Sequence, residues 1–123
     1  MDQSGYHKLI VYQKAKIMAV FVYQITKTYP SHEQHGLISQ MRRSAVSVPA
    51  NIVEGYTKSS TKDYIRFLDI SLGSLAELEF YFELSIELNY INQETYSKFQ
   101  TMALEINKLL RSFQKSLRVK LDQ

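Results

Sequence analysis

The stretch SQMRRSAVSVPANIVEGY, residues 39 to 56, decides the fold, because it has helical periodicity on both sides of a proline. Apolar residues recur at spacings of three and four along one side of it. A proline inside a helix removes one N–H donor and clashes with the carbonyl four residues earlier, here that of Ala45, at a cost of about 3 kcal/mol. The helix therefore continues through Pro49 only if packing on both sides is strong, and we expect a bend there.

The two sides of this predicted helix differ in chemistry. The apolar side consists of Leu37, Met41, Ala45, Val48, Ile52 and Tyr56. The polar stripe consists of Gln40, Arg43, Ser47, Asn51 and Glu54. Because the apolar side runs unbroken past Pro49, it supplies the packing that the proline requires.

Length and composition predict one helical domain over residues 1–123. The chain is 45% hydrophobic and 22% charged, and four glycines and two prolines are too few for a disordered or all-β chain. It has no cysteine, which excludes disulfides and thiolate zinc sites and is compatible with a reducing compartment. We see no signal peptide and no segment as long as a membrane span. A cytoplasmic protein with no membrane partner is expected.

Apolar periodicity predicts four helices, at about residues 7–28, 32–55, 61–88 and 93–119. Up-down-up-down order is the economical arrangement, so we expect an all-α antiparallel four-helix bundle whose second helix is bent by proline. The boundary signals are a capping box at Ser31 and Gln34, a left-handed terminator at Gly55, a cap at Ser60 and Asp63, a left-handed residue at Asn89 and a cap at Asn92.

The first and third predicted helices both have broad apolar surfaces. In the first, Ile10, Ile17 and Phe21 are expected to widen the side that faces the core. The third has two apolar stripes, and a bundle of this size readily covers only one. The second stripe predicts an oligomer interface formed by Phe67, Ile70, Tyr81, Leu84 and Leu88. The alternative is that the third helix is central and that three neighbouring helices cover it.

Charge is segregated along the chain. Residues 1–66 carry nine Lys/Arg and four Asp/Glu, residues 67–97 carry six Asp/Glu and no Lys/Arg, and residues 98–123 carry six Lys/Arg and two Asp/Glu. In the last helix a basic stripe lies opposite the apolar heptad and consists of Lys108, Arg111, Lys115 and Arg118. Such a stripe is often only a solvated face, but copies of it in a symmetric ring would build a strong positive field.

Three stretches carry a resemblance to a known family. They are LIVYQKA at residues 9–15, SQMRRSAVSVPANIVEG at 39–55 and RFLDISLGSLAELE at 66–79. In this order and at these separations, they resemble the small four-helix-bundle proteins encoded by intervening sequences within bacterial 23S ribosomal RNA genes. The resemblance covers about residues 9–91, and the family has a proline at the same place in its second helix.

The resemblance implies an antiparallel bundle and self-association into a cyclic homo-oligomer, with a pentamer as the expected assembly. It also suggests nucleic-acid binding. A related subgroup, the accessory variability proteins of diversity-generating retroelements, forms a basic pentameric barrel that works with a reverse transcriptase and its RNA. No enzymatic activity and no cofactor come with the resemblance.

Arg42 and Arg43 have two alternative roles. In the structural role they pair with acidic groups of the third helix, such as Glu77 or Glu79, while Asn51 and Glu54 satisfy backbone groups near Pro49 or the following loop. In the functional role the two arginines contact phosphates on the surface of a ring.

Catalytic and metal-binding patterns are weak. His32 and His35 lie three residues apart in a loop without further evident ligands, so we expect no metal site. Glu79, Glu83 and Glu87 share one arc of a helix but lack the E-x-x-H pairs of a di-iron bundle. No catalytic constellation is evident, and the protein is expected not to be an enzyme.

The leading functional hypothesis is non-catalytic binding of structured nucleic acid, RNA in preference to DNA. Arg42, Arg43 and the basic stripe of the last helix are its candidate contacts. The rival hypothesis is a scaffold ring that binds another protein and has no affinity for nucleic acid. Its expected docking surface is the exposed Phe80 and the acidic arc around Glu83 and Glu87.

Overall fold

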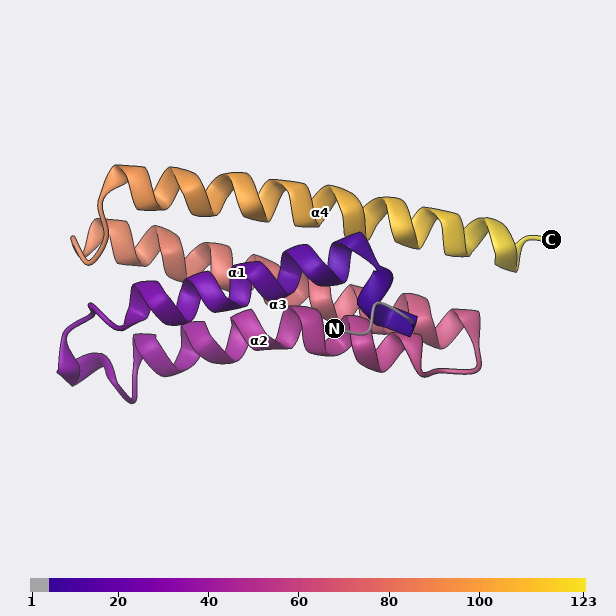
Figure 1. Cartoon of the computed structure of the whole chain (residues 1–123), viewed down its shortest axis with the longest axis horizontal. Coiled ribbons are helices and arrows are strands. Elements are labelled where there is room, and N and C mark those ends of the chain that lie inside the picture. Colours follow the sequence, from indigo (N-terminus) through magenta and orange to yellow (C-terminus); the bar gives the residue numbers. More distant parts are fainter. Residues whose placement is uncertain (1–4) are drawn as a thin grey trace.

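The computed structural model describes residues 5–123, in which four long α-helices and two short 3-10 helices follow one another (Figure 1). Their bounds are η1 Gly5–Lys8, α1 Ile10–Thr26, η2 Ser31–Glu33, α2 Leu37–Tyr56, α3 Thr61–Glu87 and α4 Gln93–Leu121. No strand occurs within residues 5–123, and the predicted all-α four-helix fold is confirmed. Among the described helices, none combines the length and the apolar character that a membrane crossing requires.

The four long helices lie side by side, and consecutive helices run in opposite directions (Figure 1). α2 packs against α1 and α3, and α4 packs against α3 and α1. Within the described residues α1 and α3 make no close backbone contact, so they lie at diagonally opposite corners of the bundle. The third helix therefore has two helical neighbours, and the alternative of a central helix with three neighbours is wrong.

Aromatic stacking joins the helices at the centre of the core. The rings of Phe82 on α3 and Phe99 on α4 stack with centroids 3.7 Å apart. Phe21 of α1 lies parallel to Phe82 at 6.4 Å. Further fully buried side chains come from all four helices and include Met18, Met41, Ile52, Leu68, Leu75 and Leu110. Most of the predicted apolar residues thus meet in one core, as helical periodicity requires, whereas Tyr56 at the end of α2 is 41% exposed.

One polar side chain is buried between α3 and α4. Gln114 is 1% exposed, and its Nε2 donates hydrogen bonds to the carbonyl oxygen of Ile65, at 3.3 Å, and to Oδ1 of Asp69. A buried amide must be bonded to avoid a desolvation penalty, so these two bonds fix where α4 lies along α3.

Three of the predicted boundary signals are confirmed. The Ser60 hydroxyl accepts a hydrogen bond from the backbone N–H of Asp63, and the Asn92 side chain accepts one from Thr95. Asn89 has a φ of 63°, in the left-handed region that follows many helices.

The predicted capping box at Ser31 is wrong. Ser31 begins the short helix η2, no side chain caps that helix, and α2 begins only at Leu37. Glu33 caps α2 instead, because its Oε1 accepts from the Leu37 N–H at 3.2 Å. Hydrogen bonds from the Tyr90 hydroxyl and from Leu37 N–H lower the pKa of Glu33 below its ordinary value.

The proline lies inside an uninterrupted α2. Hydroxyl groups join α2 to α3 beside it: the Ser47 and Ser74 oxygens are 2.7 Å apart, and Ser71 donates to the Val48 carbonyl at 2.9 Å. Asn51 donates to the Ser47 carbonyl at 2.8 Å. Polar bonds and packing together hold the helix on both sides of Pro49, whereas the bend itself stays a prediction.

Gly55 does not end α2, so its predicted role as a left-handed terminator is wrong. It is buried within the helix, which continues to Tyr56, and its φ is not positive. A Cβ at this position would lie 2.8 Å from Cδ1 of Tyr64 and 3.1 Å from Cβ of Phe67, both on α3. The residue is glycine because α2 and α3 approach closely here, and not because of its backbone conformation.

Much of the predicted interface stripe on α3 is covered within the monomer. Phe67, Tyr81 and Leu84 are half-buried, and Tyr81 and Leu84 pack against the core. Ile70 and Leu88 remain exposed, at 40% and 44%. The close approach of α2 explains most of the second apolar stripe, because α2 covers one side of α3 and α4 covers another.

The prediction that Ile10 and Ile17 widen the core-facing side of α1 is wrong. Both are 60% exposed, whereas Phe21 is buried as expected. The physical reason is that, within residues 5–123, α2 and α4 are the long helices that pack against α1, and Ile17 lies on the part of the α1 surface that they leave uncovered.

We predict that Gly55→Ala lowers the free energy of unfolding by about 1–3 kcal/mol, because the new methyl group forces α2 away from α3. Urea unfolding followed by circular dichroism measures this. Gly73→Ala is the matched control: a methyl group added there, on α3, would have no neighbouring atom within 4 Å, so the same substitution should stabilise the protein by about 0.5–1 kcal/mol. Equal effects of the two substitutions would contradict the close-approach explanation.

Candidate nucleic-acid interface

The basic stripe of α4 owes its exposure to the heptad on the other side of the helix. Phe99, Ala103, Ile106, Leu110 and Leu117 are buried against the bundle. Lys108, Arg111, Lys115 and Arg118 follow spacings of three and four on the opposite side and are all exposed. Burial of the heptad therefore turns the four cations toward solvent.

The four cations of this stripe are not neutralised by any acidic group of residues 5–123. Within residues 5–123 the ion pairs join Lys14 to Glu105 and Arg66 to Asp63. None of the four stripe residues takes part in an ion pair or a side-chain hydrogen bond of the described chain. Like charges at these spacings repel, so an anion that binds along the stripe gains attraction and also relieves that repulsion.

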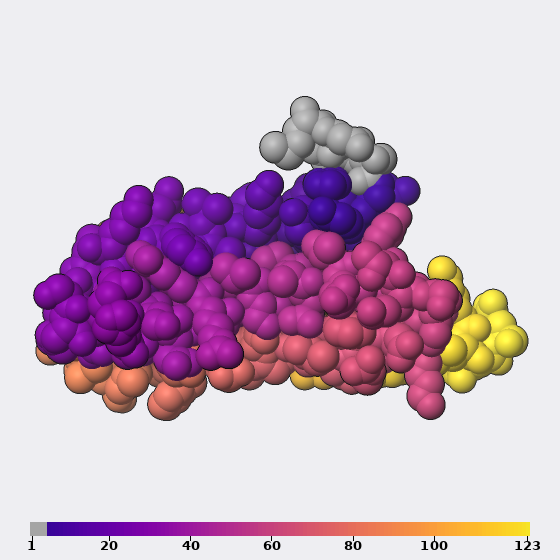
Figure 2. Space-filling view, turned by 90° about the horizontal axis from the view of Figure 1, so that it is seen from below, coloured from indigo at the N-terminus to yellow at the C-terminus, as the bar shows by residue number. Residues whose placement is uncertain are grey.

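The stripe extends toward a projecting end of the bundle. The last turns of α4 reach past the ends of the neighbouring helices (Figures 1 and 2). This end is the yellow segment of Figure 2, and Arg118 and Lys120 lie in its last turn. Positive side chains also complement the negative end of the helix dipole, which favours their position here.

Arg42 is held by α1. Its Nε donates to Oγ1 of Thr26 at 3.0 Å, its Nη2 lies 3.5 Å from the Tyr23 carbonyl, and its guanidinium lies 4.7 Å from the centre of the Tyr23 ring. Thr26 is itself buried. These contacts support a structural role, in which Arg42 holds α2 against α1 along the line where the two helices meet, called here the α1–α2 seam.

Arg43 is exposed and lines two hollows. It shares one with Arg42 and Tyr23, and the other with Gln40, Ser44, Ser47, Ser74 and Glu77. No ion pair joins Arg42 or Arg43 to Glu77 or Glu79 within the described residues, so the pairing expected from the sequence is not found. Of the two arginines, Arg43 is the one whose cation is free to contact a ligand.

The rest of the polar stripe on α2 has mainly structural contacts. Ser47 bonds to Ser74 of α3, as described above, and Asn51 bonds to Ser47, with 2.9 Å between the Asn51 Nδ2 and the Ser47 hydroxyl oxygen. Glu54 Oε2 lies 3.5 Å from the Thr57 hydroxyl at the end of α2. These residues hold α2 together and leave Gln40 and Arg43 exposed at its other end.

A surface of opposite charge lies on α3. Glu83 and Glu87 are exposed, and Glu79 is half-buried. Burial raises the pKa of Glu79 above its ordinary value, and the negative charge of Glu83 adds to this. Phe80 lies among these residues and is 56% exposed. This acidic arc repels phosphate, so it confines any nucleic-acid contact to other faces.

The two histidines of the η2 region do not gather further metal ligands. His32 Nε2 lies 3.5 Å from the Tyr90 hydroxyl, and His35 is exposed. Among residues 5–123, no group of three His, Cys, Asp or Glu side chains is arranged to hold a metal ion.

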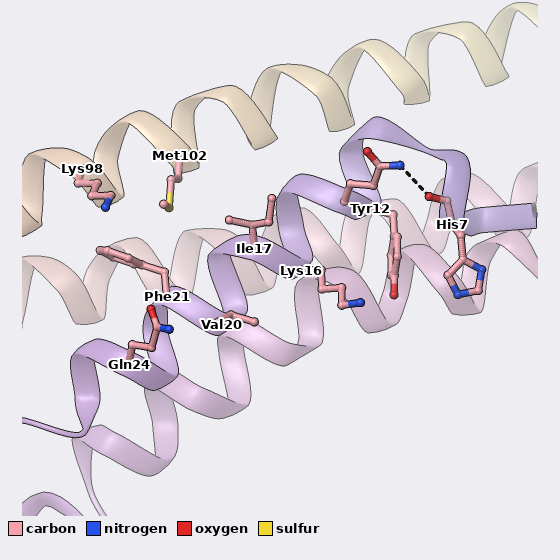
Figure 3. Close-up of a pocket in the computed structure, with 10 residues that line it drawn as sticks. His7, Tyr12, Lys16, Ile17, Val20, Phe21, Gln24, Lys98 and Met102 are labelled. Atoms are coloured by element: carbon pink, nitrogen blue, oxygen red, sulfur yellow. Dashed lines mark hydrogen bonds between the residues drawn. The ribbon is translucent and has the colours of Figure 1, made fainter. Parts of the chain in front are cut away.

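A groove between α1 and α4 was missed by sequence reasoning (Figure 3). Ile17, Val20 and Phe21 line it from α1, and Lys98 and Met102 line it from α4. Figure 3 shows the α4 side chains reaching toward the α1 residues across it. The signal that could have revealed it is the width of the apolar side of α1, which two neighbouring helices cannot cover completely.

These features define a class of protein: a small all-α bundle whose last helix presents four basic side chains to solvent, none of them in an ion pair within residues 5–123. The family model described as 23S rRNA-intervening sequence protein matches residues 7–112, and the chain belongs to this family. Lys108 and Arg111 lie within the matched range, and Lys115 and Arg118 lie beyond it. A search of curated proteins finds no match.

A similar solved structure supports the same assignment. It is the crystal structure of a protein with unknown function from the S23 ribosomal protein family of Bacteroides thetaiotaomicron VPI-5482. The two chains are 34% identical, with a TM-score of 0.80, and the similarity covers 86% of this chain and 96% of that chain. The likeness therefore includes nearly the whole bundle.

We predict that Arg42→Ala lowers the free energy of unfolding by about 1–2 kcal/mol, because it removes the bond to Thr26 and the contact with the Tyr23 ring. Thermal and urea unfolding measure this. Arg43→Ala is the control next to it and should leave stability within about 0.5 kcal/mol of the wild type. An equal loss for both variants would show that the contacts of Arg42 are not what stabilises the seam.

Proposed function

We propose that this protein is a non-catalytic cyclic homo-oligomer of the cytoplasm that binds structured nucleic acid, RNA in preference to DNA, through the basic stripe of α4. The observation that carries the proposal is the set of four exposed cations without an anionic partner in the described chain. The cytoplasmic location rests on the lack of cysteine, which suits a reducing compartment.

The family name adds support for RNA as the partner. Members are described as 23S rRNA-intervening sequence proteins, which associates them with a ribosomal RNA locus. The net charge of +3 favours a polyanion in general, and its segregation places the positive charge on defined faces.

Symmetry would strengthen a contact that is weak in one copy. Four cations per subunit become a ring of such stripes in a cyclic oligomer, and several stripes on one RNA act at high effective concentration. Arg43, exposed on α2, is the candidate second contact. Arg42 contributes by holding α2 against α1.

The chemistry of the stripe determines how binding should behave. Lysine and arginine contact phosphates, whereas sequence is read through base edges or stacking. No aromatic side chain interleaves with the basic ones at this stripe. Binding should therefore be strongly salt-dependent and show a modest sequence preference.

We predict that the double variant K108E/R111E weakens binding of a structured RNA hairpin by about tenfold or more. It should also make the fall of the logarithm of the association constant with the logarithm of the salt concentration less steep, because fewer phosphates are contacted. Fluorescence anisotropy at several salt concentrations measures both quantities. The control K8E/K27E changes the net charge equally on residues outside the stripe and should bind almost as the wild type does.

Two results would count against this proposal. If the two double variants lose affinity equally, net charge and not the stripe governs binding. If the wild type binds neither the hairpin nor a matched duplex DNA at low salt, the nucleic-acid role fails for this ligand class. The scaffold alternative is then favoured, with the exposed Phe80 and its acidic surroundings as the protein-docking surface.

A further inference from the structure

The groove between α1 and α4 is an apolar hollow on the described surface that the proposed nucleic-acid contact does not use. It has a volume of about 450 Å³, and its apolar lining includes Ile17, Val20, Phe21 and Met102. Ile17 and Val20 remain 60% and 50% exposed. Apolar side chains of this size in one concave surface are typical of a binding site for another apolar group.

The groove is also positively charged. Lys98 holds its ammonium 5.5 Å from the centre of the Phe21 ring, and Lys16 lines the same groove from α1. Neither lysine forms an ion pair within residues 5–123. By contrast, Lys14 is neutralised by Glu105 at 3.1 Å, between the same two helices. The groove therefore fits an apolar group that is accompanied by carboxylates.

A surface with that chemistry exists on α3 of this same chain. Phe80 is 56% exposed, and the exposed Glu83 and Glu87 follow it on the same side of α3 at spacings of three and seven residues. Leu104 of α4, which is 58% exposed, lines a neighbouring hollow together with Glu79 and Glu83. The carboxylates there also have no basic partner on their own helix segment, since residues 67–97 contain no lysine or arginine.

The two surfaces cannot meet within one molecule. Phe80 lies on the outer side of α3, and α3 is the helix diagonally opposite α1. A Phe80 side chain can reach an α1–α4 groove only on a second copy. Because the two surfaces lie on opposite sides of one molecule, a pair of copies cannot make both contacts at once. The contact is therefore head-to-tail, and repeated contacts of this type close into a ring when the rotation between subunits allows it.

We propose that Phe80 of one copy docks into the α1–α4 groove of the next copy, with Glu83 and Glu87 facing Lys16 and Lys98. The inference rests on the proposed homo-oligomer and assigns the two surfaces that build it. The contact pairs an aromatic anchor with an apolar hollow, surrounded by complementary charges. It differs from the interface predicted on the sequence, of which Ile70 and Leu88 are the exposed members.

The test uses the full chain and measures its mass by analytical ultracentrifugation over a range of concentrations. Phe80→Asp and Ile17→Asp each change an exposed side chain and each should weaken self-association by about thirtyfold or more, as loss of a central anchor does. Ile70→Asp is the matched control on α3, 40% exposed, and should keep the wild-type mass. Circular dichroism checks that all three variants remain folded.

Mixing the two defective variants gives the sharper result. The Phe80→Asp chain retains an intact groove, and the Ile17→Asp chain retains an intact Phe80, so an equimolar mixture should form a 1:1 dimer. This dimer cannot grow, because its two outer surfaces are the defective ones. Rescue by mixing shows that these two surfaces bind each other, and growth of the wild type beyond a dimer shows that the contact is head-to-tail.

The other outcomes distinguish failure of the proposed Phe80–groove contact from failure of the proposed homo-oligomer. If the wild type is oligomeric and Phe80→Asp or Ile17→Asp leaves its mass unchanged, the homo-oligomer stands and the proposed contact is overturned. A loss of assembly for Ile70→Asp alone would likewise overturn it in favour of the stripe predicted from the sequence. A wild type that is monomeric at all concentrations overturns both the oligomer and this contact, while RNA binding is judged separately by the anisotropy titration.

Discussion

The rest of the structure depends on the short distance between α2 and α3. The hydroxyl oxygens of Ser47 and Ser74 are 2.7 Å apart, and the absence of a side chain at Gly55 leaves room for the Tyr64 ring. Small residues on one helix allow the other to approach, and the approach brings Ser71 within bonding distance of the Val48 carbonyl beside Pro49. A helix that contains a proline is thus supported by its neighbour. The same closeness makes α3 the helix against which both α2 and α4 are positioned.

Periodicity and local capping chemistry predicted most of this fold. The caps at Ser60 and Asn92 and the left-handed Asn89 depend only on residues a few positions away, and the structure has them where they were expected. Gly55 was misread because its role depends on a neighbouring helix and not on its own turn. The capping box at Ser31 failed for a related reason: Glu33, tied to Tyr90 of a distant loop, supplies the cap to Leu37.

In the candidate site, too, features that depend on one helix could be predicted, and features that depend on contacts between helices could not. Exposure of the α4 cations follows from the heptad opposite them, so it could be predicted from one helix alone. The difference between Arg42 and Arg43 could not, because it depends on where Thr26 and Tyr23 lie across the seam. Ile17 was assigned to the core because periodicity shows that a side is apolar but not whether a partner covers it. When the apolar side of a helix is wider than its neighbouring helices can cover, the uncovered residues are therefore candidates for contacts with another molecule.

The buried amide of Gln114 has a further consequence for α4. Its bonds to Ile65 and Asp69 select one axial register between α3 and α4, since a slip by one turn would leave the amide without partners at a cost of about 1–3 kcal/mol. A heptad of apolar residues alone tolerates such slips far better, because one layer can replace another. The length of α4 that projects beyond the bundle is thus a fixed quantity, and every copy of the chain presents the cations of α4 at the same distance from the end of the bundle.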